Sequence, residues 1–144
     1  DDGVLSCHLL TNQKLPSNWN DKKLQTNWKK ILELRDAFLF FHEKIRNAKK
    51  MKSTMEADVY FFFKEKRFKD LAELVNLSEI LICSNVSISD SCDEKFEEFI
   101  ENENILVKIE KVDGYKCPRC WKTFKDNFKK ELCIRCEEVI NESF

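Results

Sequence analysis

Two pairs of cysteines near the end of the chain constrain its fold most strongly. Each pair encloses two residues, and the four positions are Cys117, Cys120, Cys133 and Cys136. A Cys-x-x-Cys pair can place two sulfurs on one metal ion, and two such pairs complete the tetrahedral Cys₄ set of a structural zinc site. We therefore expect residues 114–144 to form a small Cys₄ zinc-ribbon or knuckle module that holds one Zn²⁺.

The alternative interpretation of these cysteines is a pair of disulfides. The chain has seven cysteines, an odd number, and no basic flank followed by an apolar core at its start, so a secreted disulfide framework is disfavoured. A catalytic zinc is also disfavoured, because the two histidines, His8 and His42, lie far from the cysteine pairs in sequence. We expect Cys83, in an apolar segment, to be a core residue.

Apolar residues recur at helical spacing over residues 22–48. They are Leu24, Trp28, Ile31, Leu34, Phe38, Phe41, Ile45 and Ala48. This period predicts one long amphipathic helix of about 40 Å, with lysines on the face away from the apolar stripe. Before it, residues 1–20 are expected to be an extended lead-in that Leu5, Leu9, Leu10 and Trp19 could pin to a neighbouring element.

The middle of the chain carries shorter patterns of both kinds. Apolar and β-branched runs predict strands at residues 59–63, 80–88 and 104–112. Asp70 followed by Glu73 resembles a capping box and predicts a short helix that begins there. Phe96, Phe99 and Ile100 suggest a second short helix, acidic in composition. The expected class is α+β: the long helix packs with a small mixed α/β subdomain, followed by the cysteine module.

Charge is distributed unevenly along a chain whose net charge is only −1. Residues 22–52 carry a net +7 and residues 114–136 a net +5, with a net −5 over residues 86–112 between them. Two cationic zones suit a polyanion bound along one face, although solvated helix faces would give the same pattern. With two glycines in the chain, a glycine-rich nucleotide-binding loop is excluded.

The segment between and beside the cysteine pairs mixes basic and aromatic residues. Cations there could follow RNA phosphates while a ring stacks on an unpaired base. The expected RNA contacts are Arg119, Trp121, Lys122, Lys125 and Arg135. The alternative is that Trp121, Phe124 and Phe128 form the small hydrophobic core that a zinc module needs.

The cysteine motifs also carry a family resemblance. Residues 114–121 and 132–136 contain Lys-Cys-x-Arg-Cys-Trp and Leu-Cys-x-Arg-Cys, and this pairing closely resembles the C-terminal end of bacterial-type isoleucyl-tRNA synthetase. Residues 28–36 resemble the family's Trp-x-x-Leu-Leu-x-x-Arg-Asp stretch, and residues 6–9 and 50–58 also resemble family segments. The resemblance thus covers nearly the whole chain.

The resemblance implies three parts and a function. Residues 1–56 would end a helical anticodon-binding domain, residues 57–113 would form the α/β subdomain, and residues 114–144 the zinc domain that reaches the anticodon loop. The full-length enzyme would join isoleucine to its tRNA with ATP, whereas this chain has no motif that could hold ATP and no expected catalytic residue. Its expected partners are tRNA and the remainder of the synthetase chain.

The sequence also leaves two alternative functions open. A similar zinc module occurs in formamidopyrimidine-type DNA glycosylases, so a DNA-repair zinc finger is one alternative, and a zinc-ribbon protein-interaction module is another. The chain starts at Asp1 rather than Met, which indicates a piece of a longer protein. Because no apolar run approaches about 20 residues, we expect a soluble protein. The resemblance to the synthetase implies a cytoplasmic, monomeric enzyme.

Overall fold

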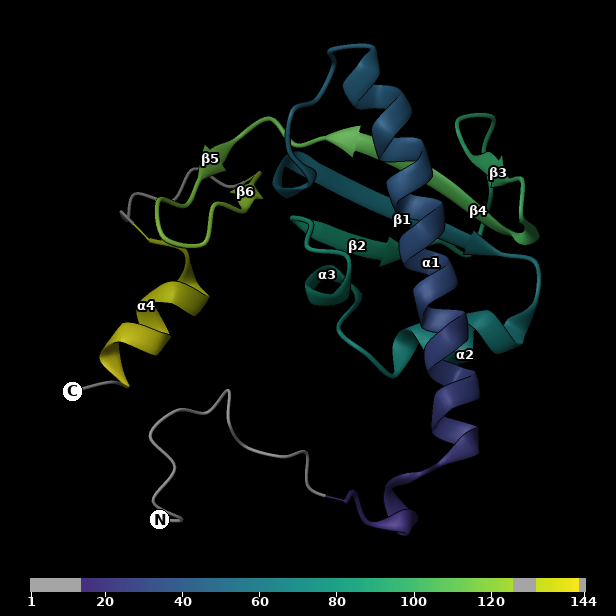
Figure 1. Cartoon of the computed structure of the whole chain (residues 1–144). Coiled ribbons are helices and arrows are strands. Elements are labelled where there is room, and N and C mark those ends of the chain that lie inside the picture. The colour runs from purple at the N-terminus through teal and green to yellow at the C-terminus, as the bar shows by residue number, and fades with distance from the viewer. Residues whose placement is uncertain (1–13, 126–131, 143–144) are drawn as a thin grey trace.

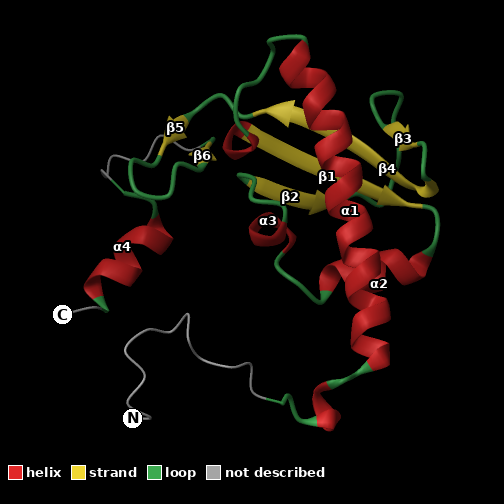
Figure 2. Ribbon diagram, in the orientation of Figure 1, coloured by secondary structure: helices red, strands yellow, loops and turns green. Residues whose placement is uncertain are grey.

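The computed structural model of the chain describes residues 14–125 and 132–142. In these residues a long helix, α1 (Lys22–Asn47), crosses one face of a four-stranded sheet, and a smaller part lies beside the sheet (Figure 1). This smaller part, residues 114–125 and 132–142, contains both Cys-x-x-Cys pairs and is called the cysteine module below. The expected mixed α and β class, with a long helix and four gathered cysteines, is confirmed (Figure 2).

Helix α1 begins at the predicted residue and ends one residue before the predicted end. The Asp21 side chain caps its first turn by accepting a hydrogen bond from the Leu24 N–H at 2.9 Å. At the other end Lys49 has a φ of 56°, and the Lys50 N–H donates to the Ile45 carbonyl at 3.1 Å. A left-handed residue therefore terminates the helix. The buried residues of α1 are Ile31, Leu34, Ala37, Phe38, Phe41 and His42.

The sheet supplies the other half of the core. From one edge to the other its strands are β2 (Asn85–Ile88), β1 (Ala57–Phe63), β4 (Asn102–Lys111) and β3 (Glu97–Phe99). Strand β1 pairs parallel with β2 and antiparallel with β4, which in turn pairs antiparallel with β3. Alternate residues of β1, Val59 and Phe61, are completely buried in the same core as Phe38 of α1. The β1 and β4 predictions are confirmed to within two residues.

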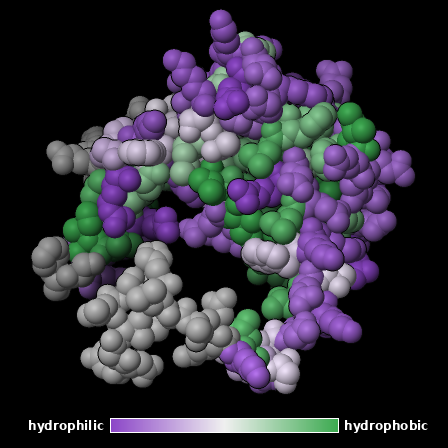
Figure 3. Space-filling view, viewed as in Figure 1, coloured by the Kyte–Doolittle hydropathy of each residue, from purple (hydrophilic) through white to green (hydrophobic). Residues whose placement is uncertain are grey.

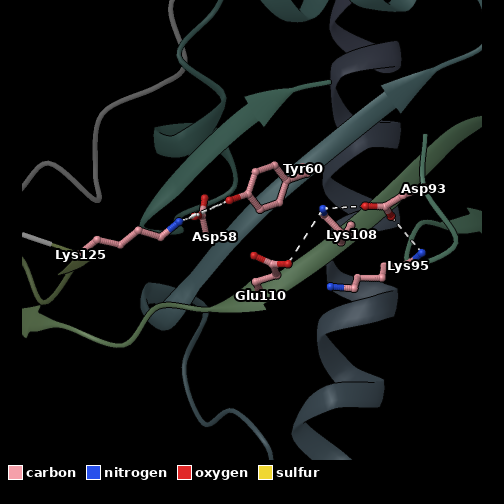
Figure 4. Close-up of polar contacts among 7 residues, drawn as sticks. All are labelled: Asp58, Tyr60, Asp93, Lys95, Lys108, Glu110 and Lys125. Atoms are coloured by element: carbon pink, nitrogen blue, oxygen red, sulfur yellow. Dashed lines mark hydrogen bonds and ion pairs between the residues drawn. The ribbon is translucent and has the colours of Figure 1, made fainter. Parts of the chain in front are cut away.

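The sheet face opposite α1 carries charged and aromatic side chains. Tyr60 of β1 pairs with Lys108 of β4, whose Nζ lies 4.7 Å from the Tyr60 ring centroid and 5.1 Å from that of Phe96. Ion pairs of 3.3 Å to Asp93 and 4.0 Å to Glu110 hold the same ammonium (Figure 4). Because side chains alternate along a strand, Asp58 projects to this face with Tyr60.

The predicted helix start at Asp70 is wrong. Helix α2 (Lys66–Glu73) begins four residues earlier, so Asp70 lies inside it, and its N-cap residue Glu65 makes no side-chain capping bond. Phe68 and Ala72, one helical turn apart, are the buried residues of α2. The Phe68 ring lies 6.2 Å from that of Phe63. The position of this helix is therefore set by burial of Phe68 and not by a capping box.

Two further predictions are wrong or too long. The helix suggested by Phe96, Phe99 and Ile100 is instead the short strand β3, because Glu97 and Glu98 pair with β4 and Phe99 is buried in the core. The predicted strand at residues 80–88 is divided. Its first part ends helix α3 (Leu77–Ile80) and turns through Ile82, whose φ is 55°, so that only β2 remains extended.

The lead-in contributes little to the described core. Leu5, Leu9 and Leu10 lie outside the described residues, and Trp19, in the short 3₁₀ helix η2 (Ser17–Trp19), is 68% exposed. The expectation that Trp19 pins the lead-in to a neighbouring element is therefore not supported by its exposure. Across residues 14–125 and 132–142, no helix combines the length and apolarity that crossing a membrane requires.

Candidate metal centre

The structure brings the four predicted ligands together. Cys117 and Cys120 lie in the turn that joins β5 (Tyr115–Lys116) to β6 (Thr123–Phe124), and Cys133 and Cys136 lie at the start of α4 (Ile134–Asn141). All four sulfurs lie within 4.8 Å of one another, and those of Cys120 and Cys133 are 3.7 Å apart. A tetrahedral site with Zn–S bonds of about 2.3 Å requires sulfurs about 3.8 Å apart. The donor set therefore fits a structural zinc.

The first cysteine pair is held by a tight backbone turn. The Trp121 N–H donates to the Cys117 carbonyl at 2.9 Å, and the Cys117 N–H donates to the Lys122 carbonyl at 3.0 Å. Trp121 has a φ of 65°, a left-handed conformation that is rare for a bulky residue. The turn thus brings the two sulfurs to the same side, with Trp121 directly after Cys120 in the sequence.

The second cysteine pair begins helix α4. Cys133 is the N-cap residue, and its carbonyl accepts the Glu137 N–H at 3.0 Å. Cys136 follows within the first helical turn and is completely buried. Backbone N–H groups at a helix N-terminus favour negative charge, so this position suits thiolate ligands.

The local environment shifts the pKa values of the Cys117, Cys120 and Cys133 thiols in different directions. Burial raises the pKa of the Cys117 thiol, but backbone N–H groups of Cys120, Cys133 and Arg119 outweigh this effect and lower it to about 6. Burial raises the pKa of the Cys133 thiol to about 12, and burial also raises the pKa of the Cys120 thiol. A divalent cation would allow all four sulfurs to be thiolates. Four sulfur ligands also leave no open position for a substrate.

The predicted RNA-contacting ring lies on the surface. Trp121 is 62% exposed, and its Nε1–H donates to the Pro118 carbonyl at 3.1 Å. The small core of the cysteine module instead consists of Cys117, Cys133 and Cys136, with Phe124 and Leu132 packed against it. The described structure therefore favours an exposed role for Trp121 and a packing role for Phe124. Phe128 lies outside the described residues.

The four predicted RNA-contacting cations all have partners within the protein. Arg119 donates to the Cys136 sulfur at 3.5 Å. The other three reach across to the sheet and α3: Lys122 to Ser78 Oγ at 3.2 Å, Arg135 to Glu79 at 3.2 Å, and Lys125 to the carboxylate of Asp58. The Thr123 N–H adds a hydrogen bond of 2.9 Å to Ser84 Oγ. Lys122, Lys125 and Arg135 thus join the cysteine module to the α/β subdomain.

Sequence reasoning missed the subdomain side of this junction. Asp58 stands between Ala57 and Val59 in an otherwise apolar run, which was the available signal that this carboxylate has a buried partner. No sequence pattern marked Ser78, Ser84 or Glu79.

The surface of α4 carries exposed apolar residues. Hydrophobic surface gathers over α4 in Figure 3, and Ile134, Val139 and Ile140 are exposed.

Comparisons with known proteins agree with the sequence resemblance. No family model matches the chain. An isoleucine–tRNA ligase from Brachyspira hyodysenteriae is 37% identical over 145 residues, which cover 96% of this chain and 15% of the relative. Isoleucine–tRNA ligases from Natranaerobius thermophilus and Mesoplasma florum are each 32% identical, over 85% and 94% of this chain and 14% of each relative. The chain therefore spans about one seventh of the length of these relatives.

The sequence matches, together with the long helix and the cysteine cluster, define the class. The chain is a segment related to the aminoacyl-tRNA synthetases. Within that class it is homologous to the isoleucine–tRNA ligases over nearly its whole length, and its resemblance to the C-terminal region of the bacterial-type isoleucyl-tRNA synthetase is confirmed.

Proposed function

We propose that this chain is the C-terminal tRNA-binding region of an isoleucine–tRNA ligase and that its cysteine module contacts the anticodon loop. The exposed position of the Trp121 side chain supports this proposal most directly. Its ring is 62% exposed, its Nε1–H is held by the Pro118 carbonyl, and it directly follows Cys120. A ring already fixed in place loses little conformational freedom when it stacks on a base.

In this proposal the metal is structural. Cys117, Cys120, Cys133 and Cys136 bind one Zn²⁺, which holds the two ends of the module together and supplies no chemistry to a substrate. We assign residues 114–144 to the zinc-binding domain, residues 57–113 to the α/β subdomain, and residues 1–56 to the end of the helical anticodon-binding domain.

The cations around Trp121 have two roles in the proposal. Arg119, Lys122, Lys125 and Arg135 already donate within the protein. Lysine has three N–H donors and arginine five, so Arg119, Lys122 and Arg135 can also donate to phosphates beside the stacked base. The Lys125 ammonium, in contrast, is held by Asp58 and Tyr60. The attraction of the cations to RNA should fall steeply with salt, because bound cations release counterions from the phosphates.

The activity proposed for the whole ligase is the joining of isoleucine to its tRNA with ATP, in the cytoplasm and as a monomer. Binding of ATP and formation of the adenylate then belong to other parts of the enzyme, with which this chain acts. We expect the chain by itself to give only background pyrophosphate exchange with isoleucine.

The test uses the full-length ligase carrying Trp121→Ala. Loss of one stacked base should weaken tRNA binding by about 1–3 kcal/mol, or roughly 5- to 150-fold in Kd. Adenylate formation should be unchanged. Trp19→Ala is the matched control, because Trp19 is also exposed but lies far along the chain from the cysteine module. Altering the anticodon of the tRNA should weaken binding to the parent enzyme, and it should weaken binding to the Trp121→Ala variant by a smaller factor.

Three kinds of result would contradict the proposal. If Trp121→Ala keeps its tRNA affinity, or loses it only together with its zinc, the ring has a structural role. If the zinc-loaded chain binds duplex DNA more tightly than tRNA, the DNA-repair alternative is favoured, and RNA binding that does not respond to salt would favour the protein-interaction alternative.

A further inference from the structure

Asp58 is a buried carboxylate at the junction between the sheet and the cysteine module. Its side chain is 2% exposed. The Tyr60 hydroxyl donates to its Oδ2 at 2.9 Å, the Asn85 side-chain amide donates to its Oδ1 at 3.0 Å, and the Lys125 ammonium donates to Oδ2 (Figure 4). Three donors therefore satisfy the carboxylate, and the only charged one comes from the cysteine module.

Lys125 reaches Asp58 from the end of strand β6. Its ammonium also donates to the Tyr60 hydroxyl at 3.4 Å, so two residues of β1 hold it. The chain separation between Asp58 and Lys125 is 67 residues, and this contact therefore fixes two distant parts of the sequence relative to each other. Hydrogen bonds with Asp58 and Tyr60 raise the pKa of Lys125, which keeps the ammonium charged.

The Asp58 contact differs from the others at the junction. Lys122 donates to a neutral hydroxyl, and Arg135 pairs with Glu79, whose side chain is 47% exposed to solvent. An exposed ion pair contributes little because water and salt screen it. A buried carboxylate that loses its cation is destabilised, because burial disfavours its charged form. Departure of the module from the sheet would thus leave a buried carboxylate without its cation at Asp58, in addition to breaking the neutral Thr123–Ser84 hydrogen bond.

We propose that Asp58 and Lys125 form a positioning pair that fixes the orientation of the cysteine module, and with it the Trp121 ring, relative to the sheet and α1. Lys125 acts mainly through Asp58 in this account, and loss of either side chain releases the module. The consequence for RNA rests on the function proposed above for Trp121, whereas the consequence for orientation does not.

The orientation is tested without RNA, by distances between two spin labels on the zinc-loaded chain. One label is attached to Cys92, which is exposed, and the other to a Glu138→Cys substitution on the exposed face of α4, in a Cys7→Ser background. The parent should give one narrow distance distribution. Asp58→Asn and Lys125→Met should each broaden it, and Lys125→Arg should restore it, because arginine keeps the charge.

Controls separate orientation from unfolding. Glu110→Gln removes the carboxylate directly across from Asp58 in the sheet and should leave the distribution narrow. Zinc content and helical circular dichroism identify a variant that fails to fold. If Asp58→Asn unfolds, Lys125→Met decides the question, because the Lys125 side chain is 62% exposed and its replacement leaves no internal cavity. An unchanged distance distribution in Lys125→Met would overturn the proposal.

The RNA measurement then distinguishes positioning from direct phosphate contact in the full-length ligase. A positioning pair predicts that Asp58→Asn and Lys125→Met weaken tRNA binding by similar factors, that the double variant is no weaker, and that the salt slope is unchanged. A phosphate contact predicts that Lys125→Met alone weakens binding and lowers the salt slope by about one. If the parent binds no tRNA, the proposed function fails, but the label distances still test the pair.

Discussion

The Cys120 and Cys133 sulfurs, which come from different cysteine pairs, lie 3.7 Å apart, close to the edge of a zinc–thiolate tetrahedron. We therefore expect one zinc per chain in protein purified without added metal, measured by elemental analysis. Cys133→Ser should reduce the zinc content to near zero and unfold the cysteine module, because structural zinc supplies much of the folding free energy of such a module. Helix α1 should remain, since its core lies elsewhere.

The exposed Cys92 provides the control for this experiment, and Cys92→Ser should keep the full zinc content. Protein free of metal, with Cys117, Cys120, Cys133 and Cys136 paired as disulfides, would contradict the metal assignment.

His42 should make the stability of the α1 core depend on pH. Its side chain is buried against Phe38, and its Nε2 is the buried side-chain atom without a hydrogen-bond partner among the described residues. Burial lowers the pKa of His42 below its usual value, despite an opposing hydrogen bond with the Ser53 backbone. The neutral form is thus favoured in the folded state. The resulting stability is complete above the ordinary pKa and is lost as pH falls toward the folded-state pKa.

The measurement is urea unfolding followed by circular dichroism between about pH 7.5 and pH 5.5. His42→Leu should reduce the loss of stability over this interval. Equal pH dependence in the parent and in His42→Leu would exclude the buried imidazole as the cause.

The features predicted correctly from the sequence are those encoded locally. The apolar residues of α1 recur at helical spacing along most of the helix, and each Cys-x-x-Cys pair is a local motif, so neither pattern needs a distant partner to be recognised. Strand β3 was missed because its conformation depends on pairing with β4, and Phe99 fits a helix face as well as a strand. Asp58 was missed because its partner Lys125 is 67 residues away. Local periodicity carries no information about such a pair.

Phe38 should be among the residues that stabilise the α1 core most. Its side chain is completely buried in the same cluster as Val59 and Phe61. Phe38→Ala should lower the free energy of unfolding by about 3–5 kcal/mol, because it removes a large buried ring and leaves a cavity. Leu39→Ala, at the adjacent but exposed position, should cost less than about 1 kcal/mol. Chemical denaturation of the two variants side by side measures the difference, and equal effects would show that α1 is not held by this core.

Gly114 should be required for the register of the β5–β6 hairpin. A Cβ at this position would overlap the Phe124 carbonyl oxygen and lie 2.9 Å from the carbonyl carbon. The obstructing atoms belong to the backbone of β6, so a side-chain rotation cannot relieve the overlap, and the strands must separate. Phe124 packs against the cysteine cluster, so this separation is transmitted to the metal ligands. Gly114→Ala should therefore destabilise the module by about 1–3 kcal/mol, the usual cost of overpacking.

The effect of Gly114→Ala is best measured as the rate at which a chromogenic chelator removes zinc from the chain. The rate should rise in Gly114→Ala and stay at the parent value in Asp113→Ala, which changes the adjacent exposed residue. Thermal unfolding of α1, followed in the same variant, should be nearly unchanged because the core around Phe38 does not contain Gly114. A parent-like rate of zinc removal would mean that the hairpin accommodates a Cβ at residue 114, and the close approach to Phe124 would then not control the metal site.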